Sequence, residues 1–346
     1  MKLAPIARGS LLGVAAAVLF GMSTPLITHL GRGVGAFVTA TLLYGGATIG
    51  AGLPMRNAAP VIRRPQLLRL AIVAVFGAVL APASLAWGLQ HTGALSASLL
   101  LNLEAVFTVF LARAIYREAI GSRVALAVGL MVAGGALLAF RTSTAGAAST
   151  LGMAAILAAS FAWALDNTLT RPLADFDPRT VVFGKALLGA GLSGAIALAL
   201  GERWPSLDNG LGLLACGAAG YGVSLRLYLG AQRILGAART GSLFAVAPFV
   251  GAALAFALGD RENVLLVAFA SVLFGIAVYL HVTEAHAHRH RHEGLDHEHA
   301  HRHDDAHHAH SHDPPVHGEH SHPHRHEPIE HEHEHGSDLH HRHSHD

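Results

Sequence analysis

Long apolar segments separated by short polar ones fill the first 280 residues of the chain. A helix needs about 20 mostly apolar residues to cross a bilayer. Apolar residues lie on all faces of these segments, and no sustained two-residue alternation indicates strands. The pattern predicts an all-α integral membrane protein. Its ten predicted spans are 10–30, 34–53, 67–89, 94–113, 124–140, 151–170, 180–200, 210–229, 238–258 and 264–280.

Two of the apolar segments match each other. Leu99–Glu118 reads LLLNLEAVFTVFLARAIYRE, and Phe244–Glu262 reads FAVAPFVGAALAFALGDRE. When Glu104 is aligned with Pro248, the Arg-Glu pairs that end both segments also align. A doubled unit inside one hydrophobic chain is typical of transporters built from repeats. The match therefore predicts two halves of five spans each.

The basic residues predict how the chain is oriented. With a cytoplasmic N-terminus, 15 Lys and Arg fall inside and four outside, which follows the positive-inside rule. Ten spans return the C-terminus to the cytoplasm, and five spans per half make the two repeats inverted. The predicted organisation is a cytoplasmic N-terminus 1–9, repeat one 10–140, a linker 141–150, repeat two 151–281 and a disordered His-rich cytoplasmic tail 282–346.

Composition separates the spans from the tail. Hydrophobic residues make up 52% of the chain and charged residues 14%, against about 25% charged in soluble domains. The net charge of +1 conceals +9 before residue 286 and −8 after it. No basic-aromatic module, Gly-rich phosphate loop or nucleophile elbow is present. The sequence therefore predicts neither nucleic-acid binding nor an enzyme, and it requires no cofactor.

Several stretches resemble the EamA-type branch of the drug/metabolite transporter superfamily. They are FGMSTPLITHL in the first span, the unit from Ala94-Leu-Ser-Ala to Arg117-Glu118, SFAWALDNTLTR, and AVAPFVGAALAFALGDRE. The resemblance covers residues 10–281. It implies a 5+5 inverted-repeat carrier, usually an exporter of amino acids, metabolites or amphipathic drugs. The chain departs from that pattern at Glu104, where the family often has the proline that Pro248 retains.

Charged residues inside the spans are the candidate functional groups, because each costs at least about 2.5–3.5 kcal/mol at the bilayer centre. Glu104 lies near the middle of the 94–113 span. Desolvation there favours the neutral carboxyl, so Glu104 is predicted to exchange a proton or bind a substrate ammonium. The alternative is a protonated acid that only holds helices together. Asn102 is nearby in sequence but on another helix face.

A second polar position is Asp166–Asn167, in the 151–170 span. Asp166 could pair with Lys185 or Arg226 and form a cytoplasmic gate. The alternative favoured for both bases is that they extend toward the membrane interface.

Aromatic residues and prolines mark further positions. The aromatics that could line a pocket for an organic substrate, with packing or interfacial anchoring as the alternative, are Trp87, Trp163, Tyr221 and Tyr228. The prolines predicted to kink spans are Pro25, Pro82 and Pro248. The spacing Gly46-x-x-x-Gly50 is typical of close helix packing.

The tail holds 24 of the 27 histidines within residues 286–346 and almost no bulky apolar residue. It cannot bury enough surface to fold alone. Imidazoles and carboxylates two residues apart suit Zn²⁺, Ni²⁺, Co²⁺ or Cu²⁺. The predicted ligands are His286, His288, His290, His292, His297, His299, His301, His303, His307, His308, His310, His312, His331, His333 and His335. The alternative is a buffering tail whose metal affinity is incidental.

These observations predict a multi-pass carrier of the inner (plasma) membrane. The leading hypothesis is a proton-coupled exporter of small metabolites with a metal-binding tail. A divalent-metal exporter that uses the tail as metal collector, and a membrane metal-storage or sensor protein, are the alternatives. Expected partners are the lipid bilayer, a small-molecule substrate and divalent ions at the tail. The oligomeric state is open, a homodimer included.

Overall fold

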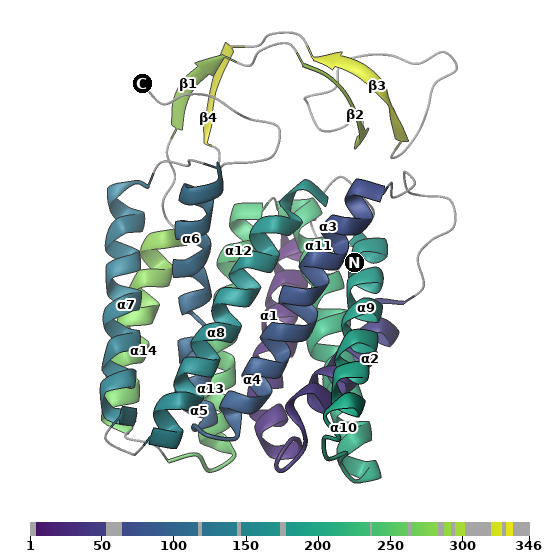
Figure 1. Cartoon of the computed structure of the whole chain (residues 1–346). Helices are drawn as coiled ribbons and strands as arrows, with labels where there is room; N and C mark the ends of the chain where they lie inside the picture. Colours follow the sequence, from purple (N-terminus) through teal and green to yellow (C-terminus); the bar gives the residue numbers. More distant parts are fainter. Residues whose placement is uncertain are drawn as a thin grey trace. The chain divides into compact units, whose positions relative to one another are not determined.

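The computed structural model describes residues 5–52, 64–116, 120–143, 147–173, 178–235, 237–261 and 264–282, and in the tail 287–291, 295–301, 320–326 and 330–334. These belong to two compact units, Met1–Glu284 and Ala285–Asp346. The first unit is a helical bundle (Figure 1), so both predicted repeats lie in one unit.

Helices occupy all ten predicted ranges. In the first half they are α1 Pro5–Leu30, α2 Ala36–Ala51, α3 Arg64–Ala74, η1 Val75–Leu80, α4 Ala81–Leu89, α5 Ala94–Leu100, α6 Leu103–Tyr116 and α7 Ser122–Ser143. In the second half they are α8 Ala147–Thr170, η2 Arg171–Leu173, α9 Pro178–Ala199, α10 Leu207–Gly217, η3 Ala218–Val223, α11 Ser224–Leu235, α12 Ala237–Phe244, α13 Ala247–Ala257 and α14 Val264–Val282. The turns η1 and η3 are π-helical.

The bundle has the composition of a membrane protein. Seven helices of the described residues are long and apolar enough to cross a bilayer, and three shorter apolar helices fill the remaining predicted ranges. Large apolar side chains face outward: Ile49, Leu198 and Leu265 are each at least 70% exposed. The prediction of an all-α membrane protein is confirmed. The number of ten spans remains a prediction.

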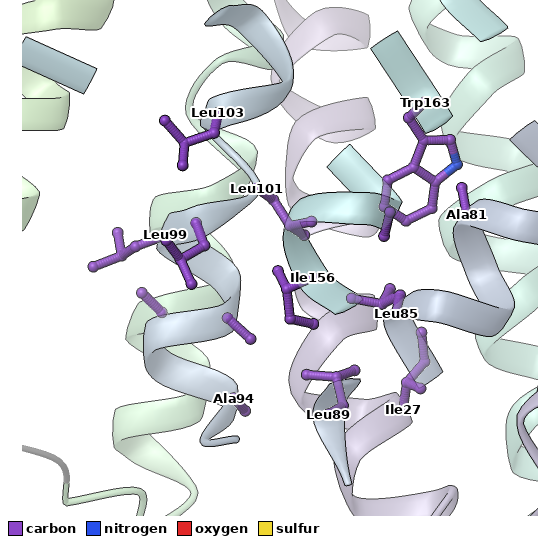
Figure 2. Packing of buried hydrophobic residues seen from close by; sticks show 14 of the residues in the cluster. Ile27, Ala81, Leu85, Leu89, Ala94, Leu99, Leu101, Leu103, Ile156 and Trp163 are labelled. Carbon is purple, nitrogen blue, oxygen red and sulfur yellow. The ribbon is translucent and has the colours of Figure 1, made fainter. Parts of the chain in front are cut away.

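Helices of the two halves alternate in space. Helix α2 packs on α9, α1 packs on α11 and α13, and α7 packs on α14 at one edge of the bundle (Figure 1). The halves therefore share one hydrophobic core. Figure 2 shows part of it, where Leu85 of α4, Leu101 after α5 and Ile156 of α8 come together.

The predicted close packing at Gly46 and Gly50 is confirmed. A Cβ on Gly46 would overlap the carbonyl of Leu214, and one on Gly50 would overlap the carbonyl of Ala218. Both contacts join α2 of the first half to α10 and η3 of the second. The two glycines thus allow backbones of different repeats to touch, which larger residues would prevent.

Four described segments of the tail are strands, where the sequence predicted disorder. They are β1 Ala287–Arg291, β2 Leu295–His301, β3 His320–His326 and β4 Glu330–Glu334. Strand β1 pairs with β4 and β2 with β3, both antiparallel. The expectation rested on the missing apolar core, and the described strands pair in two-stranded sheets without one. The two-residue alternation of His that predicted metal ligands is also the period of a strand.

Candidate functional site: a polar cluster between the two repeats

Matching helix breaks shape both copies of the doubled unit. The α-helix is interrupted by a two-residue turn at Leu101–Asn102 and again at Ala245–Val246. New helices, α6 and α13, start directly after each break, so Glu104 and Pro248 are each the second residue of a half-helix. The aligned positions are thus structurally equivalent. The predicted 94–113 span falls within Ala94–Tyr116, which is long and apolar enough to cross a bilayer; the turn inside it was not predicted.

The two breaks have different local causes. The side chain of Asn102 donates to the carbonyl of Leu99 at 3.0 Å and competes with the helix backbone. Pro248 has no N–H to continue the helix from α12. Pro248 therefore begins a helix and does not kink one. Pro82 lies inside the continuous helical segment 64–89, just after the π-helical turn η1, and Pro25 lies within α1.

Two carboxyl groups meet where α6 packs against α8. Glu104 accepts a hydrogen bond from Nδ2 of Asn167, at 2.6 Å from its Oε1. The residue before Asn167 is Asp166, which forms an ion pair with Lys185 of α9 and accepts a hydrogen bond from Thr170. Of the two intramembrane acids, one is therefore paired with a cation and the other with a neutral amide.

Charge around Glu104 is unevenly balanced. Asp166 and Lys185 both lie within electrostatic range of Glu104. The hydroxyl groups of Tyr44 and Tyr228 also lie within electrostatic range of Glu104. Two carboxyl groups thus share one ammonium, so the group is neutral overall only when Glu104 carries a proton or faces a bound cation.

The π-helical turn η1 leaves one carbonyl without a backbone partner. The N–H of Ala81 donates to Phe76, which removes the donor that an α-helix would offer Gly77. In a π-helix the carbonyl of Gly77 would accept a hydrogen bond from the backbone N–H of residue 82. That residue is Pro82, which has no N–H. Such π turns are frequent at functional sites.

Side chains from two other helices donate hydrogen bonds to the carbonyl of Gly77. Tyr44 Oη donates to Gly77 O at 2.5 Å, and Trp163 Nε1 donates to it at 3.1 Å. A Cβ on Gly77 would collide with the Asp166 carboxylate, so glycine allows Asp166 to approach the turn. Sequence reasoning missed Tyr44 and Gly77. The signal available was Pro82, five residues after Gly77.

Aromatic rings from both repeats surround this polar cluster. The ring centroid of Tyr221 lies 5.5 Å from Phe20, 5.6 Å from Tyr44 and 6.3 Å from Trp163. Tyr228 packs at 5.0 Å against Phe244, which is 5.3 Å from Phe20. Of the four predicted aromatics, the structure brings Trp163, Tyr221 and Tyr228 together.

The remaining predicted residues lie elsewhere. Trp87 is 38% exposed and stacks on His91 at 4.0 Å. Asn102 is buried and bonded to its own backbone, as described. Arg226 is exposed and donates to the carbonyl of Gly50 at 3.3 Å, so Lys185 is the partner of Asp166. The favoured expectation that Lys185 extends toward the interface is wrong, because its side chain is only 14% exposed and reaches Asp166.

A cavity of about 600 Å³ opens at the end of the bundle where α1 and α4 end and α5 begins. Its lining residues include His29, Arg32, Gln90, Asp260 and Arg261. The distribution of Lys and Arg predicts that this end of the bundle faces the outside of the membrane.

Acids of the second repeat cap helices of the first at this end. Asp260 accepts from the N–H of Leu95 at 3.2 Å, at the start of α5. Glu202 accepts from the N–H of Val38 at 2.9 Å, at the start of α2. Carboxylates are favourable at helix N-termini, so both contacts hold the two repeats together there.

Among the described residues, no group of three or more His, Cys, Asp or Glu that could hold a metal ion occurs. Of the predicted tail ligands, His288, His290, His297, His299, His301, His331 and His333 lie in strands. The others, His286, His292, His303, His307, His308, His310, His312 and His335, lie outside the described residues, as do Arg117–Glu118 and Glu262.

Comparisons with known proteins agree with the doubled architecture. A profile of the EamA-like transporter family matches residues 7–140 and again 150–283. An uncharacterized transporter of Methanothermobacter thermautotrophicus is 31% identical over 201 residues, which cover 56% of this chain and 58% of that protein. A solved crystal structure has a similar fold, with a TM-score of 0.58 and 20% identity over 79% of this chain and 96% of the other.

Proposed function

Because the chain belongs to the EamA-like transporter family, we propose that it exports small metabolites, such as amino acids and amphipathic compounds, in exchange for protons at Glu104. Members of that family are transporters, and the apolar helices make this chain a multi-pass membrane protein. The proposal concerns the substrate class, the direction and the coupling ion. The predicted location is the inner membrane, with both termini cytoplasmic.

The observation that carries the proposal is the unequal pairing of the two acids. Lys185 is engaged by Asp166, and the side-chain partner of Glu104 is the neutral amide of Asn167. An ion pair holds a buried carboxylate in its charged form. Glu104 lacks that constraint, so it is the acid able to gain and lose a proton during a transport cycle.

Exchange follows from competition for one carboxylate. A proton and a substrate ammonium both neutralise Glu104, and binding of either excludes the other. The aromatic rings beside it, Tyr228 and Phe244 among them, would hold the apolar part of the substrate. Substrate leaves when a proton takes its place, as alternating-access antiport requires.

The test is flux in proteoliposomes, measured with an imposed pH gradient across a panel of amino acids and amphipathic amines. Glu104→Gln keeps the hydrogen bond to Asn167 but cannot exchange a proton, so coupled flux is expected to disappear while membrane insertion stays normal. Thr108→Ala is the matched control: its hydroxyl bonds only to the Glu104 carbonyl, one turn along α6, and full flux is expected. Normal proton-driven flux in Glu104→Gln would refute the proposal.

The same panel decides on the metal-exporter alternative. Zn²⁺, Ni²⁺ and Co²⁺ are added as substrates, with the full chain and with a chain lacking residues 286–346. The proposal expects organic solute flux from both chains and no metal flux. Metal flux that depends on the tail would replace the proposal by the alternative.

A further inference from the structure

The cavity at the predicted outer end has walls from both repeats. Residues at the end of α1 and after α4 line one part of it, and the end of α13 with its following turn lines the other. Its volume of about 600 Å³ is within the range of small-molecule sites. Buried Pro25 and Ala94 line it together with exposed Arg32 and Arg261. The cavity therefore extends from the surface into the bundle.

Two arginines of this cavity are exceptions to the distribution of basic residues. The predicted orientation places four basic residues outside, Arg32, Arg141, Arg203 and Arg261. Two of the four, Arg32 and Arg261, line the same cavity. Lys and Arg favour the cytoplasmic side, so membrane insertion gives no reason to place two guanidinium groups together here. Recognition of an anion would explain the pair.

Glycine turns lie beside both arginines. Gly33 directly follows Arg32 and has a φ of 70°, and Gly259, two residues before Arg261, has a φ of 101°. These left-handed conformations suit glycine and strain other residues. Both glycines line the cavity, and a Cβ on either would meet no atom within 4 Å. The backbone thus leaves open space next to each arginine.

The charges of the lining residues do not cancel. Asp260 is the acid among them, and its carboxylate already accepts a hydrogen bond from the N–H of Leu95 at 3.2 Å. With His29 counted as neutral, two guanidinium groups and one carboxylate give a balance of +1. A cleft with an excess of one sign of charge concentrates ions of the opposite sign. The cavity therefore favours anions over cations.

The two arginines differ in how they are held. Arg261 donates from Nη1 to the carbonyls of Phe256 and Asp260, and its guanidinium carbon lies 4.3 Å from the centre of the Phe256 ring. The N–H groups on its Nε and Nη2 remain for a ligand. Among the described residues, none forms a hydrogen bond or ion pair with the guanidinium of Arg32. One arginine is thus fixed in place with spare donors, and the other has all its donors open.

We propose that this cavity binds the carboxylate of a small organic acid, with Arg32 and Arg261 as its anion-binding residues. A guanidinium can form two parallel hydrogen bonds to one carboxylate. Leu89, Ala255 and Leu258 also line the cavity, and they would contact an apolar substituent. The ligand class is a carboxylate with a small apolar body, such as an aromatic amino acid or the same acid without its amino group.

The source of the ligand rests on the proposed function, because a solute exported past Glu104 leaves the bundle at this end. Glu104 selects a positive group and the outer cavity a negative one, so the two charged groups of a zwitterion are bound at successive places. Binding at the cavity requires no proton gradient. Loss of coupled flux with intact binding at the cavity would therefore refute the proposed function alone.

The first test measures the local charge with a thiol on the cavity wall. Thr92 lines the cavity, and Thr92→Cys adds a thiol there; the native Cys216 is buried, so the unchanged chain is the blank. Rates of labelling by methanethiosulfonate ethylsulfonate, an anion, and methanethiosulfonate ethyltrimethylammonium, a cation, are compared in full-length protein. The anionic reagent is expected to be favoured. Arg32→Gln should reduce that preference by about threefold.

The matched control places the thiol outside the cavity. Leu207 is 77% exposed at the start of α10 and does not line the cavity. In Leu207→Cys the ratio of the two rates should not respond to Arg32→Gln. An equal response at both thiols, or no preference for the anion at Thr92→Cys, would overturn the proposal.

The second test identifies the ligand chemistry by protection of the same thiol. Labelling of Thr92→Cys in detergent is repeated with 3-phenylpropionate, phenylalanine and phenethylamine, which share a ring and differ in carboxylate and ammonium. Both carboxylates should slow labelling, and phenethylamine should not. Arg32→Lys keeps the charge and loses the paired hydrogen bonds, so the reagent ratio should persist while protection weakens about tenfold.

Three results would contradict a carboxylate site. They are protection by phenethylamine equal to that by the acids, protection by inorganic phosphate but by neither acid, and full protection by the acids in Arg32→Lys.

Discussion

Removing the acid of the buried ion pair gives the sharpest test of how the bundle balances charge. Asp166→Asn removes the ion-pair partner of Lys185, whose side chain is only 14% exposed, and leaves Glu104 as the acid within electrostatic range of that ammonium. Breaking a buried pair from one side costs about 3–5 kcal/mol. The exposed fraction lets the ammonium keep some water, so the expected loss is at the low end, about 3 kcal/mol.

The loss is measured by denaturant-induced unfolding in mixed micelles, followed by tryptophan fluorescence. The double variant Asp166→Asn with Lys185→Met should recover to within about 1 kcal/mol of the original chain, because no charge is left unpaired.

Transport provides a second readout for the same variants. In Asp166→Asn the released Lys185 lies within electrostatic range of Glu104, so proton-coupled flux should fall. Flux should return in the double variant, where Glu104 no longer faces an ammonium released from its ion pair. Stability unchanged by Asp166→Asn, or a double variant no better than the single one, would refute this reasoning.

Three further changes have definite expected outcomes. Trp163→Phe removes one of two donors to Gly77 and should lower the unfolding free energy by about 1 kcal/mol, a small loss because the other donor remains; a change above 3 kcal/mol would mean that packing dominates. Gly50→Leu would force a side chain into the backbone of Ala218, so folded protein should be lost in size-exclusion chromatography, whereas Gly129→Leu, with open space around it, should be tolerated. Metal binding by the tail should weaken sharply below about pH 6, because imidazoles with an ordinary pKa near 6.5 take up protons, and chelator competition across pH 5–8 measures this.

Much of the fold could be predicted from apolar length and internal similarity. Apolar length and internal similarity are reliable guides because the bilayer restricts the possible structures. Every backbone group inside it must be hydrogen-bonded within helices or closed barrels. The match of Glu104 to Pro248 even located the two equivalent half-helix starts. The break before Glu104 was not predictable, since it depends on Asn102 turning onto its own backbone, a choice that tertiary packing decides.

The polar residues of the site could be predicted from the sequence, but their pairing could not. Glu104, Asp166 and Asn167 stand out as polar residues in apolar spans, but their pairing depends on which helices face each other. Lys185 reaches Asp166 because α9 packs beside η1, where Gly77 leaves room. The tail shows the opposite limit. Its alternation of histidine predicts metal ligands, and the same two-residue period is also that of a strand.

The two equivalent half-helix starts carry unlike residues, the ionisable Glu104 in α6 and Pro248 in α13. Pro248 has the backbone angle of a first helical turn whatever the pH. Glu104 assists α6 only while ionised, when its charge complements the positive end of the helix dipole by about 0.3–1 kcal/mol. Protonation of Glu104 would therefore shift the local stability of the start of α6 by about two- to fivefold. Under the proton exchange proposed at Glu104, protonation would therefore alter the start of α6 and leave the start of α13 unchanged.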